Sequence, residues 1–231
     1  MEYLFSHAGN YEDYASGRVL YGGRGVPNFP VRLVNEIFGR AKRHIPGKTR
    51  LRVYDPCCGG AYALAVLGFF HAEALETVYA SDISPDMLEI ARKNLGLLTF
   101  AGLGRRREEL ASLYESTGKP SYADALESLE RLRADLGREV ESEVFAADCT
   151  KPLPEIRPDI ILTDVPYGDL TDWQGEDELS AMLEQLRRIS AAHTVLAVCA
   201  DKAQKIRSPF WTRIEKQNIG KRRFELLRKI E

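Results

Sequence analysis

The sequence predicts a Rossmann-like α/β fold, in which helices cover an open, mostly parallel sheet. First, short apolar segments with strand character alternate with longer segments of helical periodicity. Second, acidic residues follow the strand segments directly, where open α/β sheets bind their ligands. Third, 231 residues with 44% hydrophobic and 29% charged side chains are enough to enclose one full core.

The strands and helices can be assigned in order along the chain. A strand over 51–54 is followed by a helix over 61–70. After a second strand over 77–81, Ser84 and Pro85 open a helix, because serine caps helix starts and proline fits the first helical position. The apolar face of that helix comprises Met87, Ile90, Ala91, Asn94, Leu97 and Leu98. The remaining segments are strands over 143–146, 159–163 and 194–198, and a helix over 179–189.

Two segments depart from this alternation. Residues 99–140 form an insertion before the third strand, with helical stretches over 105–116 and 121–137. At the end of the chain, the segments 213–219 and 222–230 resemble a hairpin that would add an antiparallel edge to the sheet.

The predicted elements divide the chain into two parts. Residues 1–49 precede the first strand and contain a helix over 30–44, so we expect an N-terminal helical lobe. Residues 50–231 contain all the strands and are expected to form the ligand-binding domain.

Several classes of protein are excluded. The longest apolar run, ten residues over 61–70, is well short of the roughly 18 residues needed for a membrane span. The start of the chain lacks the features of a secretory signal, so we expect a cytoplasmic location. The four cysteines and four histidines lack metal-ligand spacing, and we expect no metal site.

The net charge of −2 conceals an uneven distribution. Residues 1–50 carry a net charge of +4, residues 51–200 carry −12, and residues 201–231 carry +6. Basic ends around an acidic middle favour a polyanionic partner such as a nucleic acid. Solvated surface lysines and arginines would give the same distribution.

The acidic middle of the chain contains the candidate ligand site. Four acids follow the first four strands in order: Asp55, Asp82, Asp148 and Asp164. Gly59 and Gly60 form a tight turn that lets a ligand approach the backbone, and Asp82 has the position that binds a ribose diol in such folds. Singly, each acid could be a helix cap and the glycines a plain turn. The turn lacks the GxGxxG pattern, which disfavours pyrophosphate binding.

The most specific motif is Thr-Asp-Val-Pro-Tyr-Gly over 163–168, directly after the apolar fourth strand. It resembles the (Asp/Asn/Ser)-Pro-Pro-(Tyr/Phe) motif of S-adenosylmethionine-dependent methyltransferases that act on exocyclic amines. The Asp-Pro-Cys-Cys-Gly-Gly turn over 55–60 likewise resembles their cofactor loop. The resemblance implies a class I methyltransferase sheet with S-adenosylmethionine as cofactor.

The resemblance also implies where the cofactor binds. The loop beside its methionine part corresponds to Asp55, Cys57, Gly59 and Gly60. Asp82 would bind the ribose, with Ile83 beside it, and Asp148 would contact the adenine amine.

A substrate clamp is implied at the end of the fourth strand. Asp164, which also borders the cofactor, and the carbonyl near Pro166 would accept the amine hydrogens while Tyr167 stacks on the base. Two departures from the pattern are Ala61, where a glycine is common, and Val165, which replaces the first proline. The second departure weakens an assignment to DNA adenine or cytosine enzymes.

A closer resemblance extends over most of the chain. The matching segments are Tyr11-Glu-Asp, Ser16-Gly-Arg-Val-Leu, Phe29-Pro-Val-Arg-Leu, Asp55-Pro-Cys-Cys-Gly, Ala80-Ser-Asp, Lys93-Asn-Leu, Gly118-Lys-Pro-Ser-Tyr and the motif over 163–168. They resemble the avilamycin-resistance (AviRa-type) rRNA methyltransferase family, a methyltransferase fold with N-terminal and inserted helices. This resemblance implies methylation of the exocyclic amine of a guanosine in large-subunit (23S) rRNA, with antibiotic resistance as an associated property.

Basic and aromatic residues outside the cofactor site are candidates for RNA contacts. They are Arg18, Arg24, Arg32, Arg40, Lys42 and Arg43 near the start, Arg105, Arg106, Arg107 and Trp173 further along, and the Lys-Arg-Arg run over 221–223. Alternatively, the basic run over 105–107 is a solvated helix start and Trp173 packs under the adjacent helix.

Other functions stay open at this stage, as does the oligomeric state. The same amine clamp would serve a methyltransferase of a DNA base, a protein glutamine or a small molecule. The fold could also belong to a non-catalytic nucleotide- or RNA-binding module, or to a dinucleotide oxidoreductase. The basic ends and the helical insertion favour RNA.

Overall fold

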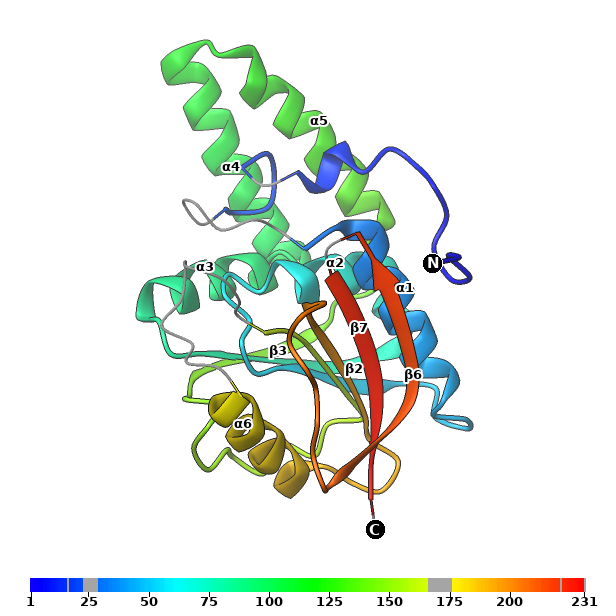
Figure 1. Cartoon of the computed structure of the whole chain (residues 1–231). Helices are drawn as coiled ribbons and strands as arrows, with labels where there is room; N and C mark the ends of the chain where they lie inside the picture. Colours follow the sequence, from blue (N-terminus) through cyan, green and yellow to red (C-terminus); the bar gives the residue numbers. More distant parts are fainter. Residues whose placement is uncertain (16, 23–28, 166–175, 221, 231) are drawn as a thin grey trace.

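A seven-stranded mixed sheet forms the centre of the protein in a computed structural model (Figure 1). The structure describes residues 1–15, 17–22, 29–165, 176–220 and 222–230. The strands are β1 (Leu51–Asp55), β2 (Leu75–Asp82), β3 (Glu141–Ala146), β4 (Ile160–Asp164), β5 (Val195–Asp201), β6 (Trp211–Ile219) and β7 (Arg222–Lys229). Their order is β3-β2-β1-β4-β5-β7-β6, which confirms the predicted α/β sheet.

The sheet combines parallel central strands with an antiparallel edge. β1 pairs in parallel with β2 and β4, β2 pairs in parallel with β3, and β4 pairs in parallel with β5. β7 is antiparallel to both β5 and β6, so the hairpin predicted at the end of the chain forms the edge. The strand order reverses between β1 and β4, and such switch points are where open α/β sheets bind ligands.

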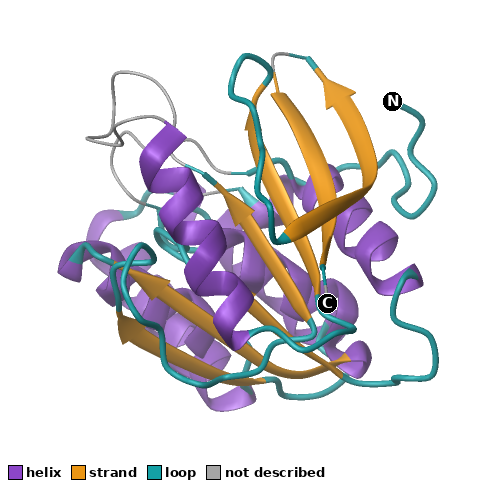
Figure 2. Ribbon diagram, turned by 60° about the horizontal axis from the view of Figure 1, so that its bottom comes forward, coloured by secondary structure: helices purple, strands orange, loops and turns teal. Residues whose placement is uncertain are grey.

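Helices cover both sides of the sheet (Figure 2). One side carries α1 (Val31–Arg43), α2 (Tyr62–His71) and α3 (Pro85–Gly96), and the other carries α6 (Glu176–Ile189); the short 3-10 turn η2 (Ala72–Ala74) joins α2 to β2. Ile160 and Leu162 of β4 pack into the hydrophobic core under α1, α2 and α3, whereas Ile161 packs into the core under α6. Burial on both faces is the reason that β4 and β5 are almost continuously apolar. In the described part of the chain, no helix has the length and apolar character to span a membrane.

The insertion is a helical hairpin that projects from the sheet (Figure 1). It comprises α4 (Phe100–Thr117) and α5 (Pro120–Asp135), which pack against each other. α4 begins earlier than predicted because the Thr99 hydroxyl caps it, accepting the N–H of Gly102 at 3.0 Å. On α5, Arg131 donates two hydrogen bonds of 2.8 and 2.9 Å to Asp13 in the 3-10 turn η1 (Glu12–Tyr14). The hairpin therefore also holds the N-terminal segment.

A buried carboxylate fastens the start of the chain to α1. Glu36 is fully buried and forms a 2.6 Å ion pair with Arg40, which also binds Glu215 on β6. The Glu36 carboxylate accepts backbone N–H groups at 2.8 to 3.1 Å from Leu4, Phe5 and Ser6. α1 itself contacts α2, β4 and β5, so it shares the core of the sheet.

Candidate cofactor and substrate site

Four acidic residues lie at the carboxyl edge of four neighbouring strands. Asp55, Asp82 and Asp164 end β1, β2 and β4, and Asp148 lies two residues beyond β3. The four strands are parallel neighbours in the order β3-β2-β1-β4, so their carboxyl ends meet at the same edge. The residues were identifiable from the sequence, and the strand order brings them together.

The turn after β1 has two glycines for two different reasons. Gly59 has a φ of +50°, a region that favours glycine, and its N–H donates to Asp82 Oδ2 at 2.9 Å. A Cβ on Gly60 would lie 2.8 Å from Ile90 Cγ2 on α3, so this glycine allows the turn to approach the helix closely. The turn is thereby fixed between the ends of β1 and β2.

Asn94 on α3 also holds this turn, a role that the sequence alone did not reveal. Its side-chain amide donates to the Gly60 carbonyl at 2.8 Å and to the Tyr21 carbonyl at 2.9 Å, and its oxygen accepts the Tyr21 N–H at 2.8 Å. Asn94 is fully buried, and helical spacing alone assigned it to the apolar face. A polar residue at an apolar-face position was the available signal, because a buried amide needs hydrogen-bond partners.

The residues expected on the adenosine side lie beyond β2 and β3. Asp82 Oδ1 accepts the N–H of Ser84 at 2.9 Å, which orients the carboxylate, and Ile83 is 73% exposed. Asp148 Oδ1 accepts the N–H and the hydroxyl of Thr150 at 2.9 and 2.6 Å, and these hydrogen bonds lower the pKa of Asp148. The edge therefore presents two oriented carboxylates and an exposed apolar side chain.

Asp55 is the most strongly perturbed acid of the site. Burial, together with the nearby Asp82 and Asp164 carboxylates, raises the pKa of Asp55 to about 8, although the Cys57 N–H donates to it at 3.1 Å and opposes the rise. A cation beside Asp55 would favour its ionised form. Cys57 Sγ lies 3.5 Å from Cys149 Sγ, and this contact together with burial raises the pKa of the Cys57 thiol.

Asp164 is paired with a cation that comes from the other end of the sequence. Burial raises the pKa of the Asp164 carboxyl, and Arg222 on β7, whose Nη1 lies 3.3 Å from Asp164 Oδ2, opposes that shift. In the sequence Arg222 belongs to the basic run over 221–223, and nothing local indicates that its side chain reaches the end of β4. Pro166, Tyr167 and Trp173 lie outside the described residues.

The predicted RNA-contact arginines differ in their surroundings. Arg105 and Arg107 are exposed on α4, where Arg107 forms a 3.0 Å ion pair with Glu130 on α5. Arg18 is paired with Glu12. In the described part of the chain, no group of three or more His, Cys, Asp or Glu side chains is arranged to hold a metal ion.

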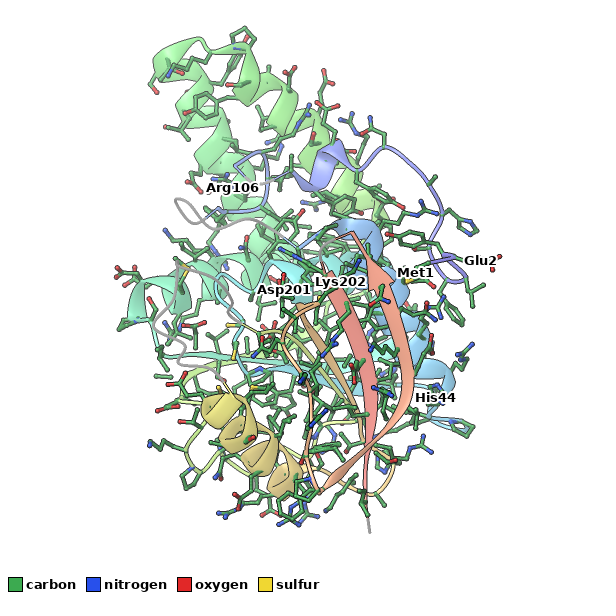
Figure 3. All side chains as sticks on the ribbon, in the orientation of Figure 1. Met1, Glu2, His44, Arg106, Asp201 and Lys202 are labelled. Atoms are coloured by element: carbon green, nitrogen blue, oxygen red, sulfur yellow. The ribbon has the colours of Figure 1, made fainter. Side chains whose placement is uncertain are left out.

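The expectation was wrong for Arg40, which is buried and paired with Glu36 and Glu215, and for Arg106. Figure 3 labels Arg106 on α4, where it is 6% exposed and its Nε donates to the Val19 carbonyl at 2.9 Å. Its guanidinium also stacks 4.1 Å from the centre of the Tyr21 ring and pairs with Glu109 at 2.9 Å. Arg106 therefore joins the insertion to the N-terminal segment, because its donors are already used inside the protein.

Comparisons with known proteins agree with this geometry. The profile of the family described as rRNA methyltransferase AviRa matches residues 1–222. The chain belongs to the AviRa rRNA methyltransferase family. A 23S rRNA (guanine(2535)-N(1))-methyltransferase of Streptomyces viridochromogenes is 40% identical over an alignment of 228 residues, and the match covers 94% of this chain and 91% of the relative.

Solved structures agree with the AviRa assignment. The rRNA methyltransferase aviRa from Streptomyces viridochromogenes matches with a TM-score of 0.87 and 39% identity, over 96% of this chain and 94% of that one. A putative methyltransferase yhhF from Escherichia coli shares the fold alone, with a TM-score of 0.52 and 12% identity over 89% and 91% of the two chains. The predicted family resemblance and class I methyltransferase fold are confirmed, and as a member of the AviRa family the chain is an rRNA methyltransferase.

Proposed function

We propose that this chain transfers a methyl group from S-adenosylmethionine to N1 of a guanosine in 23S rRNA. The observation that carries the proposal is the row of acids at the switch point in a chain 40% identical to a 23S rRNA guanine-N1 methyltransferase. The name of that relative specifies N1, a ring nitrogen, whereas the clamp motif led us to expect the exocyclic amine. N1 replaces the exocyclic amine in our proposal for this reason.

The residues at the edge fit S-adenosylmethionine, whose sulfonium methyl group is already activated for transfer. Asp82 is oriented to bind the ribose diol, Ile83 offers an exposed apolar surface for the adenine ring, and Asp148 lies beyond the neighbouring strand for the adenine amine. The methionine part would lie along the loop that contains Asp55, Cys57, Gly59 and Gly60. The acidic edge complements the positive sulfonium.

The substrate residues would act mainly by alignment. Asp164 provides a carboxylate at the end of β4, and Pro166 and Tyr167 would complete the clamp around the base. Holding the nitrogen in line with the methyl carbon can lower the activation free energy by up to roughly 7–11 kcal/mol in favourable cases. A base within folded rRNA must also be unpaired or extruded, at a cost of a few kcal/mol that stacking on Tyr167 would offset.

The test is to incubate the protein with labelled S-adenosylmethionine and unmodified 23S rRNA, and to identify the labelled nucleoside by mass spectrometry. We expect 1-methylguanosine. Label in 2-methylguanosine would restore the exocyclic amine, and label in adenosine, in protein or nowhere would overturn the proposal. Running free rRNA beside assembled large subunits identifies which form is the substrate.

An Asp164→Asn variant tests the site within the same assay. Removing a group that handles the proton of the reacting nitrogen is expected to lower kcat by roughly 10²–10⁴-fold. Asp201→Asn is the matched control, because Asp201 ends β5 at the same edge and asparagine retains an oxygen for its 2.8 Å hydrogen bond from Ala203 N–H. Equal activity of the two variants would contradict the role of Asp164.

We further propose a cytoplasmic location, where rRNA is the available substrate, and avilamycin resistance as a consequence of the methylation. Expression in an avilamycin-sensitive bacterium tests the second point. The active chain should raise the inhibitory concentration, and Asp164→Asn should not.

A further inference from the structure

Arg222 reaches the substrate carboxylate from a distant part of the sequence. It begins β7 and pairs in register with Asp201 at the end of β5, so its backbone lies two strands away from β4. Its side chain spans that distance and brings Nη1 to 3.3 Å from Asp164 Oδ2. The two side chains are 23% and 29% exposed, so both remain partly accessible to solvent.

We propose that Arg222 is a catalytic and specificity-determining residue that binds O6 of the target guanine while Asp164 binds N1–H. This inference rests on the proposed function and adds a second group to the same site. A guanidinium suits the task because its planar fork carries several donors, so it can keep its contact with Asp164 while it donates to a second oxygen.

The pair matches guanine and mismatches adenine. On the pairing edge of guanine, the O6 acceptor stands beside the N1–H donor, which complements a donor from Arg222 beside an acceptor on Asp164. On adenine the amino donor stands beside the N1 acceptor. The amino group would therefore face the donor of Arg222, and N1 would face the acceptor on Asp164. A site built to hydrogen-bond one pattern rejects the other strongly, because its own polar groups are left unpaired.

The chemistry of N1 requires a cation at this place. The N1 electron pair is not free until the N1–H proton has moved, in this case to Asp164, and the resulting negative charge is shared largely with O6. The N1 electron pair then forms the bond to the methyl carbon while the carbon–sulfur bond breaks with its electrons left on sulfur. Methylation of N1 cancels the charge, and Asp164 later releases the proton to water. Arg222 stabilises the charge during this step.

The other described groups around Asp164 do not supply that cation. The titratable groups that interact with Asp164 are Asp55 on β1, Cys199 on β5 and Arg222 on β7. The first two are acids, and among the ion pairs of the described residues Arg222 is the one cation within 4.0 Å of Asp164. Arg223, the next residue, points elsewhere and donates to the carbonyl of Lys202 at 3.3 Å.

The test compares Arg222→Gln and Arg222→Lys with the wild-type chain in single-turnover methylation at saturating rRNA and S-adenosylmethionine. Removing one donor that stabilises a developing oxyanion is expected to lower the rate by roughly 10²–10³-fold, with the cofactor Kd unchanged. Arg222→Lys keeps the charge but loses the planar fork of donors, so its rate should lie between those of the wild type and Arg222→Gln. Arg228→Gln is the matched control, because Arg228 lies on the same strand and face, about 20 Å away, and donates to the His44 carbonyl.

A second substrate separates catalysis from a structural role. In rRNA with 6-thioguanosine at the target position, N1–H is more acidic and sulfur accepts hydrogen bonds weakly. The defect of Arg222→Gln should therefore shrink at least tenfold on this substrate, whereas a structural defect would be equal on both.

The outcomes distinguish the inference from the proposed function. If the wild-type chain forms no 1-methylguanosine, both fail. If it forms 1-methylguanosine and Arg222→Gln retains a rate within threefold of the wild type, the inference alone is overturned. Should Arg222→Gln not fold, as judged by circular dichroism, Arg222→Lys decides, and a wild-type rate for that variant overturns the inference.

Discussion

Replacing Asp55 by asparagine is expected to stabilise the free protein increasingly as the pH rises from 4 to 8. Asp55 has a pKa of about 8 in the fold, because it is buried beside Asp82 and Asp164, against 3.8 for an ordinary carboxyl. A raised pKa in the folded state means that stability present at low pH is lost as the pH rises through this window. Asparagine cannot ionise and keeps an oxygen for the 3.1 Å hydrogen bond from Cys57 N–H.

The magnitude follows from the size of the shift. Between pH 4 and pH 8 the wild-type protein should lose about 1.4 kcal/mol per pH unit relative to Asp55→Asn, which amounts to roughly 5 kcal/mol at pH 8. Titrating groups far from Asp55 are common to both proteins and cancel in the difference.

Urea unfolding of both proteins at pH 5, 6, 7 and 8 measures this difference. Asp148→Asn is the matched control, because the pKa of Asp148 is lowered by Thr150 and its contribution should be constant over this range. A difference between the wild-type protein and Asp55→Asn that does not change with pH would refute the reasoning, since it would mean that Asp55 is ionised throughout.

Three further predictions concern the cofactor loop, the RNA-binding surface and the buried Glu36–Arg40 ion pair. Asn94→Leu should lower the free energy of unfolding by about 3 kcal/mol and weaken S-adenosylmethionine binding, because the buried Asn94 side chain loses three hydrogen bonds to the loop and the N-terminal segment. Urea unfolding and calorimetry measure these effects, and unchanged cofactor binding would count against a role for Asn94 in the loop. Arg105→Ala should reduce the slope of log affinity for RNA against log salt by about 0.7, because one phosphate contact is lost. Arg106→Ala should lower the stability of the fold and leave that slope unchanged. Filter binding at several salt concentrations measures both slopes, and the reverse outcome would contradict the assignment. Glu36→Ala should cost about 3–5 kcal/mol in urea unfolding, because Arg40 is left buried with fewer partners, and a loss below about 1 kcal/mol would contradict this network.

Local patterns in the sequence predicted the elements of the sheet well. The segment around Ile161 is buried on both faces, so it is almost continuously apolar and recognisable without knowledge of its neighbours. Element boundaries were less accurate, as at the start of α4, where the Thr99 cap extends the helix beyond its visible periodicity.

Contacts between distant segments escaped the sequence analysis for a physical reason. Arg106 and Arg105 are neighbours with the same chemistry, yet one is buried and the other exposed. Only the approach of the N-terminal segment to α4 distinguishes them, because it supplies carbonyl oxygens and the Tyr21 ring to one side of the helix. The same holds for Asn94, whose partners lie 34 and 73 residues away.

By itself, the sequence determined the α/β alternation, the acids that follow the strands and the motifs that indicate the AviRa family. These features are local, since strand burial, turn chemistry and strand-end residues are each written within a few consecutive positions. Tertiary structure decided which charges meet. The order β4-β5-β7 brings Arg222 to Asp164 across 58 positions of the chain, and burial of Asp55 between its neighbours shifts its pKa. Pairing and desolvation depend on what surrounds a side chain in space, and this is set only when the sheet has formed.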